Sequence, residues 1–439
     1  MKSARQTAYE ILLRIEKEGA FSNLAIDGAL ASSSLPQKDR ALVSAIIYGT
    51  TERKLTLDYQ LESRLTKPLG KLKENVHTLL RMGAYQLLFL DRIPNSAAVN
   101  ETVRLAHDNN MGYAAGMINA VLRKIAASGL ILPDENEDKL KYLSIKYSCP
   151  TPLISMWIKA YGEENTAELL KASLESSPVT LRVNKLKITA EDLISALETE
   201  NTQAVRVPEN ENALYITSLG RNIERLESFE KGYFHVQDLA SQYCAVALGA
   251  REGDRVIDMC SAPGGKSFTI AESMNNNGDI LACDIYPSRT KLIDDGAKRL
   301  GITCITTCVA DGGKYYPNVR KAERVLCDVP CSGLGVIRHK PEIKYKPLDD
   351  FKELPEIQYG ILSNAAAYVK NGGRLVYSTC TLNKKENDKV CDRFLSEHSE
   401  FKCIRPLDID AFGDKYYTLM PHKNNCDGFF IAVFQKSEE

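Results

Sequence analysis

The stretch RVIDMCSAPGGKSFTIAESM, residues 255–274, carries the clearest indication of fold in this chain. Its first six residues, RVIDMC, form an apolar run of strand length, and Gly264 and Gly265 then turn the chain. The segment KSFTIAESM begins a helix directly after the turn. A strand, a tight turn and a helix amino terminus in this order predict a ligand-binding turn at the edge of an α/β sheet.

The alternation of strands and helices continues as far as residue 380. Further apolar strands are predicted at DILACDI (279–285), CITTCVAD (304–311), RVLCDVPC (324–331) and GRLVYSTC (373–380), with helices near 289–300 and 357–370. Strands this apolar, separated by helices, predict a parallel, Rossmann-like sheet that is covered on both faces. Because ligands bind such sheets at the carboxyl ends of the strands, the chemistry is expected at that edge.

The first part of the chain, residues 1 to about 130, shows helical periodicity. Apolar residues recur at helical spacing, as in Ala8, Ile11, Leu12 and Ile15. This pattern predicts an all-helical unit. The polar, acidic stretch PDENEDK (133–139) has too little apolar surface to pack, and it predicts a linker.

The middle part mixes both periodicities. After a helical pattern around Trp157, an extended VTLRVN (179–184), a helix from about Thr189 and an extended segment ending at FHVQD (234–238) predict a small α+β module. We therefore expect three domains: an all-α domain over 1–132, an α+β module over 140–238, and an α/β domain over 239–439.

Composition limits the class of protein. The chain has 439 residues, of which 44% are hydrophobic and 26% charged, enough for two to four domains with ordinary cores. No window approaches 18 consecutive apolar residues, so we expect no membrane span and a cytoplasmic location. All twelve cysteines lie at or after Cys149 and none forms a C-x-x-C pair, so we expect neither disulfides nor a zinc or other metal site.

Charge is distributed unevenly along the chain. Residues 1–130 contain 17 Lys and Arg against 12 Asp and Glu, a net charge of +5, although the whole chain carries −1. A basic surface of this kind is typical of contact with nucleic acid. A solvated helical surface without a partner explains so small an excess equally well.

The turn CSAPGGKS (260–267) is close to two phosphate-binding motifs but matches neither. The P-loop pattern G-x-x-x-x-G-K-[ST] requires a glycine in place of Cys260, and the dinucleotide fingerprint G-x-G-x-x-G is absent. Asp284, at the end of the next strand, is placed to accept hydrogen bonds from both hydroxyls of a ribose. Asp311, after the third strand, is similarly placed to bind an adenine amino group. Alternatively, both aspartates are turn formers.

Two cysteines, Cys331 in DVPCSG (328–333) and Cys380 in YSTCTL (377–382), follow strand hydrophobics at the expected ligand edge. A free thiol is only a few per cent thiolate at neutral pH, so a reactive cysteine needs an electropositive or hydrogen-bonding neighbourhood. Strand ends that face helix amino termini can provide one. For six further cysteines we prefer a structural interpretation, since free cysteine is among the most buried residue types: Cys244, Cys283, Cys304, Cys308, Cys327 and Cys391.

Several segments together resemble a known family. CSAPGGKS, DVPCSG with the adjoining GLGVIRHKPEIK (333–344), and YSTCTL, in this order, resemble the RNA cytosine-C5 methyltransferases. Four further segments resemble the RsmB branch of this family, also called Sun/Fmu: YSCPTPLISMWIKAYG (147–162), LRVN (181–184), GYFHVQDLASQ (232–242) and MPHKNNCDGFFIAVF (420–434). The front, with RIPNSAAVNETVRLAH (92–107) and INAVLRKI (118–125), resembles the NusB RNA-binding fold.

The resemblance implies a reaction and roles for its residues. S-adenosylmethionine would methylate C5 of an unstacked cytosine in small-subunit (16S) ribosomal RNA. Cys380 would add to C6 of the ring, Cys331 would assist release, and Asp328 would bind the base near N3 and its amino group, close to the methionine part of the cofactor. The cofactor would be held by Cys260, Ser261, Ala262, Pro263, Gly264, Gly265, Lys266, Asp284, Asp311 and Asp328. The family also suggests a monomer.

Alternatives remain at this stage. DNA cytosine methyltransferases attack with the cysteine of a Pro-Cys motif, which here would make Cys331 the nucleophile. A different RNA such as tRNA, or a non-enzymatic NusB-like RNA-binding role, is also compatible with parts of the pattern. After Cys331, basic residues could meet RNA phosphates or form a solvated loop: Arg338, His339, Lys340, Lys344 and Lys346.

Overall fold

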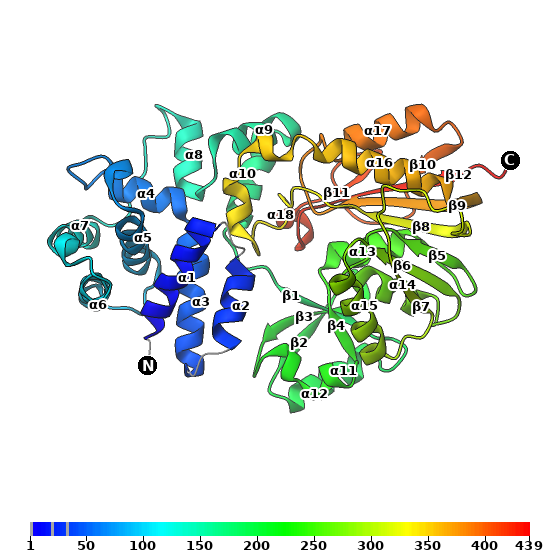
Figure 1. Ribbon diagram of the computed structural model, residues 1–439, viewed down its shortest axis with the longest axis horizontal. Coiled ribbons are helices and arrows are strands. Elements are labelled where there is room, and N and C mark those ends of the chain that lie inside the picture. Colours follow the sequence, from blue (N-terminus) through cyan, green and yellow to red (C-terminus); the bar gives the residue numbers. More distant parts are fainter. Residues whose placement is uncertain (1–2, 19–21, 32–34) are drawn as a thin grey trace. The chain divides into compact units, whose positions relative to one another are not determined.

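The computed structural model describes residues 3–18, 22–31 and 35–439 (Figure 1). The chain divides into two compact units, the first made of Met1–Glu175 and Ile337–Leu348 and the second of Ser176–Val336 and Asp349–Glu439. Within the described ranges, no helix is long and apolar enough to cross a membrane.

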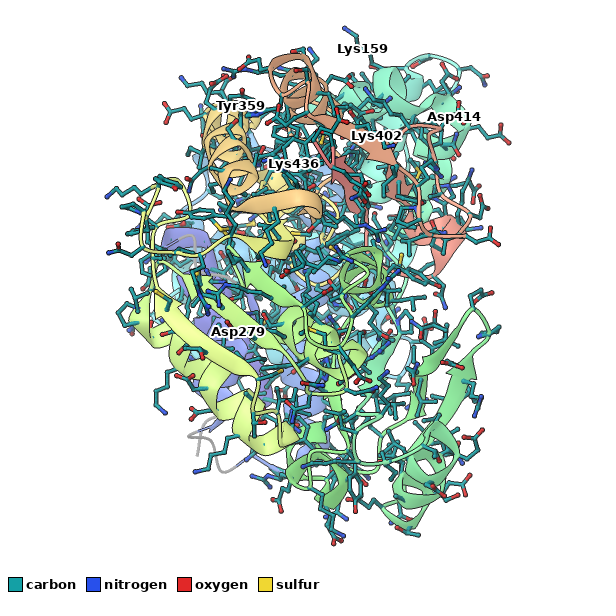
Figure 2. All side chains as sticks on the ribbon, turned by 90° about the vertical axis from the view of Figure 1, so that its right-hand side faces the viewer. Lys159, Asp279, Tyr359, Lys402, Asp414 and Lys436 are labelled. Carbon is teal, nitrogen blue, oxygen red and sulfur yellow. The ribbon has the colours of Figure 1, made fainter. Side chains whose placement is uncertain are left out.

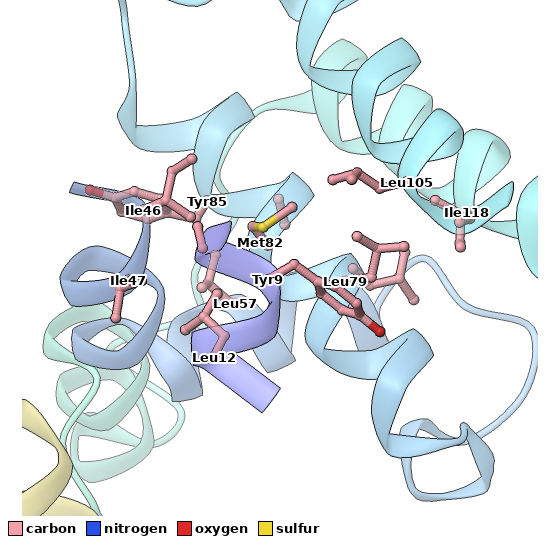
Figure 3. Packing of buried hydrophobic residues seen from close by; sticks show 14 of the residues in the cluster. Tyr9, Leu12, Ile46, Ile47, Leu57, Leu79, Met82, Tyr85, Leu105 and Ile118 are labelled. Carbon is pink, nitrogen blue, oxygen red and sulfur yellow. The ribbon is translucent and has the colours of Figure 1, made fainter. Parts of the chain in front are cut away.

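The first unit is helical, as its periodicity predicts. Its helices are α1 (Ala4–Glu18), α2 (Ser22–Ala31), α3 (Gln37–Glu52), α4 (Lys54–Glu62), α5 (Glu74–Phe89), α6 (Asn95–Asp108), α7 (Ala115–Ser128), α8 (Lys139–Tyr147), α9 (Thr151–Tyr161) and α10 (Glu163–Ala172). Figure 3 shows part of the core, in which side chains from α1, α3, α4 and α5, among them Tyr9, Ile46, Leu57 and Leu79, pack together. The predicted stripe Ala8, Ile11, Leu12 and Ile15 is buried.

A segment from much later in the sequence, Ile337–Leu348, also belongs to this unit. The short 3-10 helix η4 (Pro341–Tyr345) brings the Tyr345 hydroxyl to the backbone oxygens of Glu52, at 2.6 Å, and Ser148, at 3.1 Å. Lys344 beside it is only 2% exposed. The expectation that Lys344 meets RNA phosphates or lies in a solvated loop is therefore wrong, because packing of η4 within the helical unit buries this side chain. The sequence does not indicate this packing, because Ser148 and Glu52 lie 197 and 293 positions from Tyr345.

Burial of Lys344 has a measurable consequence. Burial lowers the pKa of its amine from 10.5 to about 8, so at pH 7 the folded protein holds a buried charge at a cost. Between pH 8 and 10.5 the unfolded chain binds more protons than the folded one, and this group's contribution to stability therefore rises with pH. We expect Lys344→Met to stabilise the protein at pH 7 by about 1–3 kcal/mol and to flatten that rise.

Urea unfolding of both proteins at pH 7 and at about pH 9.5 measures this effect. The stability difference between variant and wild type should be larger at the lower pH. A variant less stable than wild type at pH 7 would contradict the account of Lys344 as a costly buried charge.

The second unit begins at Ser176 with a sheet from the predicted α+β module; helices α8 to α10, most of which fall within the predicted range 140–238, lie in the first unit instead. The module's four strands form an antiparallel sheet in the order β2-β3-β1-β4, made of β1 (Val179–Val183), β2 (Gln203–Val207), β3 (Asn210–Ser218) and β4 (Phe234–Val236). Helix α11 (Ala190–Thr199) begins after Thr189, whose side chain accepts a hydrogen bond from the Asp192 N–H. Helix α12 (Glu227–Glu230) follows β3. The helix predicted from about Thr189 thus begins where its capping residue stands.

A buried ion pair joins this module to the α/β part of the same unit. Nε of Arg182, on β1, lies 2.9 Å from Oε2 of Glu272, and their side chains are 3% and 0% exposed. His235 lies alongside, and burial lowers its pKa to about 3, so this imidazole is neutral. Burial raises the pKa of Glu272 to about 7, and the Arg182 guanidinium opposes that rise and favours the ionised carboxylate.

Loss of one partner should destabilise the fold strongly. We expect Arg182→Ala to lower the free energy of unfolding by about 3–5 kcal/mol, because it leaves the Glu272 carboxylate buried without its cation. Replacing both partners, Arg182→Met with Glu272→Met, should recover most of that loss. Urea unfolding at about pH 8 measures it. Equal destabilisation of the single and double variants would show that shape rather than charge decides the effect.

The large sheet carries the predicted parallel strands. Five strands run parallel to one another: β5 (Arg255–Asp258), β6 (Asp279–Asp284), β7 (Ile305–Val309), β8 (Ala322–Asp328) and β9 (Val369–Thr379). Seven of the eight strands lie in the order β10-β12-β9-β8-β5-β6-β7, and β11 pairs with β12 off this path. Three further strands, which the sequence reading did not assign, run antiparallel: β10 (Phe401–Ile404), β11 (Tyr417–Leu419) and β12 (Phe429–Lys436). The sheet is therefore mixed rather than wholly parallel.

Helices cover both faces of this sheet (Figure 1). One face packs against α13 (Leu239–Ala247), α14 (Gly265–Ser273) and α15 (Pro287–Leu300), and the other against α16 (Leu354–Ala367) and α17 (Asp388–Glu397). Successive strand residues alternate between the two cores, as Val256 and Ile257 do on β5. A short helix, α18 (Pro421–Asn424), precedes β12.

The two edges of the sheet differ in what they carry. Asp279, which begins β6, and Lys436, which ends the antiparallel β12, mark the edge where the parallel strands start (Figure 2). The carboxyl ends of β5 to β9 meet at the opposite edge, and the turn 260–267 and both singled-out cysteines follow those ends. The site is built there.

Candidate active site

The glycine turn between β5 and α14 is fixed by its backbone. Gly264 has φ +110°, and a Cβ at this position would lie 2.4 Å from the ring of Phe268, so only glycine fits. The Gly264 N–H donates to the Ser261 carbonyl at 2.8 Å, and the Ser261 N–H and hydroxyl both donate to the Cys283 carbonyl. The turn is thereby tied to the neighbouring strand and opens toward the edge of the sheet.

A cavity of about 200 Å³ lies beside this turn. It is lined by Val236, Gln237, Asp238, Ser241, Asp258, Cys260, Ser261, Ala262, Pro263, Gly265, Lys266 and Asp328. Within the described residues, Gln237 Nε2 and Asp258 Oδ1 are buried there without a hydrogen-bond partner. Burial raises the pKa of Asp258 to about 7. A donor and an acceptor left over beside a glycine turn fit an amino acid headgroup, such as the methionine part of S-adenosylmethionine.

A second cavity, of about 230 Å³, opens further along the same edge. Its walls are mainly apolar, with Ile257, Leu281, Val309 and Tyr368 among its lining residues, and Asp311 contributes a carboxylate. An Asp311 oxygen accepts a hydrogen bond from the Gly313 N–H at 3.0 Å. An apolar slot with one acceptor fits a planar base such as adenine.

Asp284 is placed differently from Asp311. It ends β6 as predicted and is 3% exposed, and its carboxylate accepts a hydrogen bond from the Tyr286 N–H at 3.1 Å. Arg289 Nη1 lies 3.3 Å from the same carboxylate. Asp284 lines neither of the two cavities described above. A role for it in holding a ribose therefore stays a prediction.

The two cysteines meet although 49 positions separate them. The Sγ atoms of Cys331 and Cys380 are 3.3 Å apart, and both side chains are partly exposed. Cys380 directly follows β9, but Cys331 lies three residues beyond the end of β8, in a loop rather than at the predicted strand end. Gly335 joins the two turns: its N–H donates to the Cys380 carbonyl at 3.0 Å, and a Cβ here would lie 1.8 Å from the Gly428 oxygen.

The environment of Cys331 disfavours its thiolate. Its hydrogen bond with Cys380, burial, and the nearby charges of Cys380 and Glu386 raise its pKa well above the usual value. Cys331 is therefore a neutral thiol while Cys380 lies unmodified beside it.

An ion pair stands next to the glycine turn. Lys266 Nζ lies 2.7 Å from Asp328 Oδ2, and the Ser378 hydroxyl donates to Asp328 Oδ1 at 2.7 Å. Burial lowers the pKa of the Lys266 amine, but the neighbouring Asp328 charge outweighs it and the pKa is raised overall, so Lys266 is a cation. Asp328 remains partly exposed, with 28% of its side chain accessible, and can receive a ligand.

The structure thus unites most of the predicted site residues at one edge. All the turn residues from 260 to 266 except Gly264 line one cavity together with Asp328, Asp311 lines the next, and the cysteines face each other. Sequence reasoning missed Gln237, Asp258, Ser378 and Glu386. The sequence could have indicated Asp258, because this residue ends the first strand just as Asp284 ends the second. No group of three or more His, Cys, Asp or Glu residues suited to a metal ion occurs in the described part of the chain.

Fold and site together define an S-adenosylmethionine-dependent methyltransferase. A model described as 16S rRNA methyltransferase RsmB/F matches residues 245–435, a NusB family model matches 2–127, and an RsmF/B-like ferredoxin-like domain model matches 149–221. The chain belongs to the RsmB/F family of rRNA methyltransferases.

Full-length relatives support this membership. The chain is 37% identical, over 99% of both chains, to a probable ribosomal RNA small subunit methyltransferase B of Bacillus subtilis. It is 32% identical, over 100% of both, to a protein of the same description from Synechocystis.

Solved structures resemble the chain as well. The crystal structure of PH0851 covers 99% of both chains with 26% identity and a TM-score of 0.83. The structure of NSun6 from Pyrococcus horikoshii with SFG covers 66% of this chain and 99% of its own, with 25% identity and a TM-score of 0.61.

Proposed function

We propose that Cys380 is the nucleophile and Cys331 the proton acceptor in the reaction of this family. The chain transfers a methyl group from S-adenosylmethionine to C5 of a cytosine in small-subunit ribosomal RNA, through a cysteine–C6 adduct. The observation that carries the assignment is the 3.3 Å approach of the two sulfurs at the sheet edge that also holds the glycine turn.

In the first step Cys380 would act as a thiolate. With Cys331 held as a thiol, the charge resides on Cys380, and the thiol donates its hydrogen bond to the Cys380 thiolate. An electron pair of Cys380 Sγ forms a bond to C6, and the C5–C6 π pair moves onto C5 and into the ring. S-adenosylmethionine, when bound, supplies the methyl group that C5 then takes.

Release returns both cysteines to their starting state. Once Cys380 is bonded to C6 its charge is gone, so the pKa of Cys331 falls and this thiol can lose its proton to solvent. The Cys331 thiolate then takes the proton from C5. The C–H electron pair restores the C5–C6 double bond, and the C6–S pair leaves with Cys380 as a thiolate. One proton is released in each turnover.

Asp328 and Lys266 would hold the base. Asp328 would hydrogen-bond cytosine near N3 and its amino group, and Lys266 would counter the negative charge that enters the ring as sulfur attacks. Cofactor contacts would come from Cys260 to Lys266, with Asp284 for the ribose, Asp311 for the adenine, and Asp328 near the methionine part. The unpartnered atoms of Gln237 and Asp258 support this placement of the amino acid end.

The RNA would be a single-stranded or flipped-out cytosine, because a stacked and paired base hides C6 from a side chain. We assign RNA positioning to residues 1–132 and 140–238 and the reaction to 239–439. The three matching family models fall within these ranges and support the division. The proposal includes a cytoplasmic monomer, for which light scattering should give a mass near 48.8 kDa.

The experiment that tests this function is transfer of a labelled methyl group from S-adenosylmethionine to protein-free small-subunit ribosomal RNA, followed by nucleoside digestion. The label should appear in 5-methylcytidine. Label in any other nucleoside would overturn the assigned chemistry. If free RNA takes no label but partly assembled subunits do, the substrate named here is wrong while the reaction stands.

A further inference from the structure

A loop that the mechanism above does not use lies behind both cysteines. After Cys380, residues 381–387 lead from β9 to α17, and four of their polar residues are buried: Thr381, Asn383, Glu386 and Asn387. Two of these, Glu386 and Asn387, are adjacent in sequence and fully buried. Buried polar side chains persist where they are hydrogen-bonded, and the bonds here lead to the residues that flank each cysteine.

Glu386 holds the Cys331 turn. Its Oε2 accepts hydrogen bonds at 2.9 Å from the Ser332 N–H, immediately after Cys331, and from Gln358 Nε2. The same Gln358 amide donates to the carbonyl of Pro330, immediately before Cys331. The carboxylate therefore fixes the chain on both sides of this cysteine.

Asn387 holds the Cys380 turn in the same way. Its Oδ1 accepts a hydrogen bond from the Thr379 hydroxyl at 2.6 Å, and its Nδ2 donates to the Thr381 carbonyl at 2.9 Å. Thr379 and Thr381 flank Cys380. The hydroxyls of Ser332 and Thr381, 2.7 Å apart, then connect the two turns.

The charge on Glu386 follows from its partners. Ser332 N–H, Gln358 Nε2 and Asn383 Nδ2 all donate to its carboxyl oxygens, which suits the ionised form. Glu386 bonds to the N–H of Ser332, the residue next to Cys331, and its charge raises the pKa of that thiol. The other titratable groups beside Cys331 are Cys380 and Tyr377, whose phenol donates to the Glu386 backbone oxygen and is neutral.

We propose that Glu386 is a positioning residue that fixes the Cys331 turn and whose negative charge directs the thiolate to Cys380 rather than to Cys331. The inference rests on the proposed function, since it explains why two cysteines only 3.3 Å apart take different roles. The Glu386 carboxylate bonds to the residue next to Cys331, whereas the neutral Asn387 amide holds the Cys380 turn, so Coulomb repulsion in this buried site disfavours a thiolate on Cys331. Placing the thiolate on Cys380 requires no oxidant and no further reactant.

The test isolates Cys331 in a Cys380→Ala background and needs no RNA. Iodoacetamide labels thiolates, and mass spectrometry of the Cys331 peptide gives the labelling rate against pH. Glu386→Gln should lower the midpoint by at least about one pH unit, because it removes a nearby negative charge while keeping the size of the side chain. Glu386→Asp, which retains the charge, should restore the midpoint toward that of the parent.

Asn383→Ala is the matched control. It removes one hydrogen bond to Glu386 but leaves the charge, so a merely structural role would move the midpoint in this variant as well as in Glu386→Gln. An unchanged midpoint in folded Glu386→Gln, or an equal shift in Asn383→Ala, would overturn the proposal.

A measurement on the unaltered enzyme keeps the proposal testable if Glu386→Gln does not fold. At pH 7, iodoacetamide should modify Cys380 at least about tenfold faster than Cys331. Equal or reversed rates would overturn the inference. Both readouts are independent of methyl transfer, so a wild-type enzyme that methylates no RNA would defeat the proposed function without deciding the role of Glu386.

Discussion

Replacing Cys380 with alanine should reduce methyl transfer by about 10⁴-fold or more, because the variant has no sulfur to form the bond to C6. Without that bond, C5 of cytosine remains part of an aromatic ring and cannot attack a methyl group. Labelled methyl transfer to small-subunit RNA measures the loss. The variant should still bind S-adenosylmethionine, because Cys380 does not line the cavity beside the glycine turn. Calorimetry measures this binding.

Cys403→Ala provides the matched control for that loss. Cys403 is a partly buried thiol on β10, a strand at the end of the large sheet, and this variant should keep its activity. Denaturing electrophoresis with labelled RNA reports covalent complexes of each variant. A stable RNA adduct in Cys380→Ala, with Cys331 present, would reverse the roles of the two cysteines.

Replacing Cys331 with alanine should produce the opposite phenotype, a covalent RNA–protein complex that persists. Cys380 can still attack and C5 can still be methylated, but no thiolate is present to take the C5 proton, so elimination of Cys380 stalls. Turnover should fall by about 10²–10⁴-fold, the range typical for loss of a general base. Denaturing electrophoresis with labelled RNA detects the complex.

Formation of that complex should depend on the other cysteine. The double variant Cys331→Ala with Cys380→Ala should give no adduct at all. Normal turnover by Cys331→Ala, without any accumulated complex, would show that another group or water accepts the C5 proton, and would remove Cys331 from the release step.

Local patterns predicted the parts of this molecule that depend on local sequence. The apolar runs at 255–260 and 279–285 are strands, and the glycine turn between β5 and α14 lies where its residues predict. Cys331, Cys380 and Asp328 were placed at one edge because parallel strands share their carboxyl side. Their roles came from the family resemblance, since spacing alone does not separate a reactive cysteine from a buried one.

Long-range contacts explain what was missed. Glu386 is buried because Ser332 and Gln358, 54 and 28 positions away, donate to it, and no periodicity reports such a bond. Lys344 looked like a surface cation within a basic run, yet η4 packs it into the helical unit. The antiparallel direction of β12 likewise depends on its pairing with β9 and not on its own apolar residues.

The most direct test of the central claim is to identify which cysteine carries the RNA. The complex formed by Cys331→Ala with S-adenosylmethionine and small-subunit RNA would be digested with nuclease and protease, and the nucleotide-bearing peptide sequenced by tandem mass spectrometry. The account predicts a methylated cytidine linked to Cys380. A nucleotide on any other residue, or a wild-type enzyme whose trapped intermediate is linked through Cys331, would contradict it.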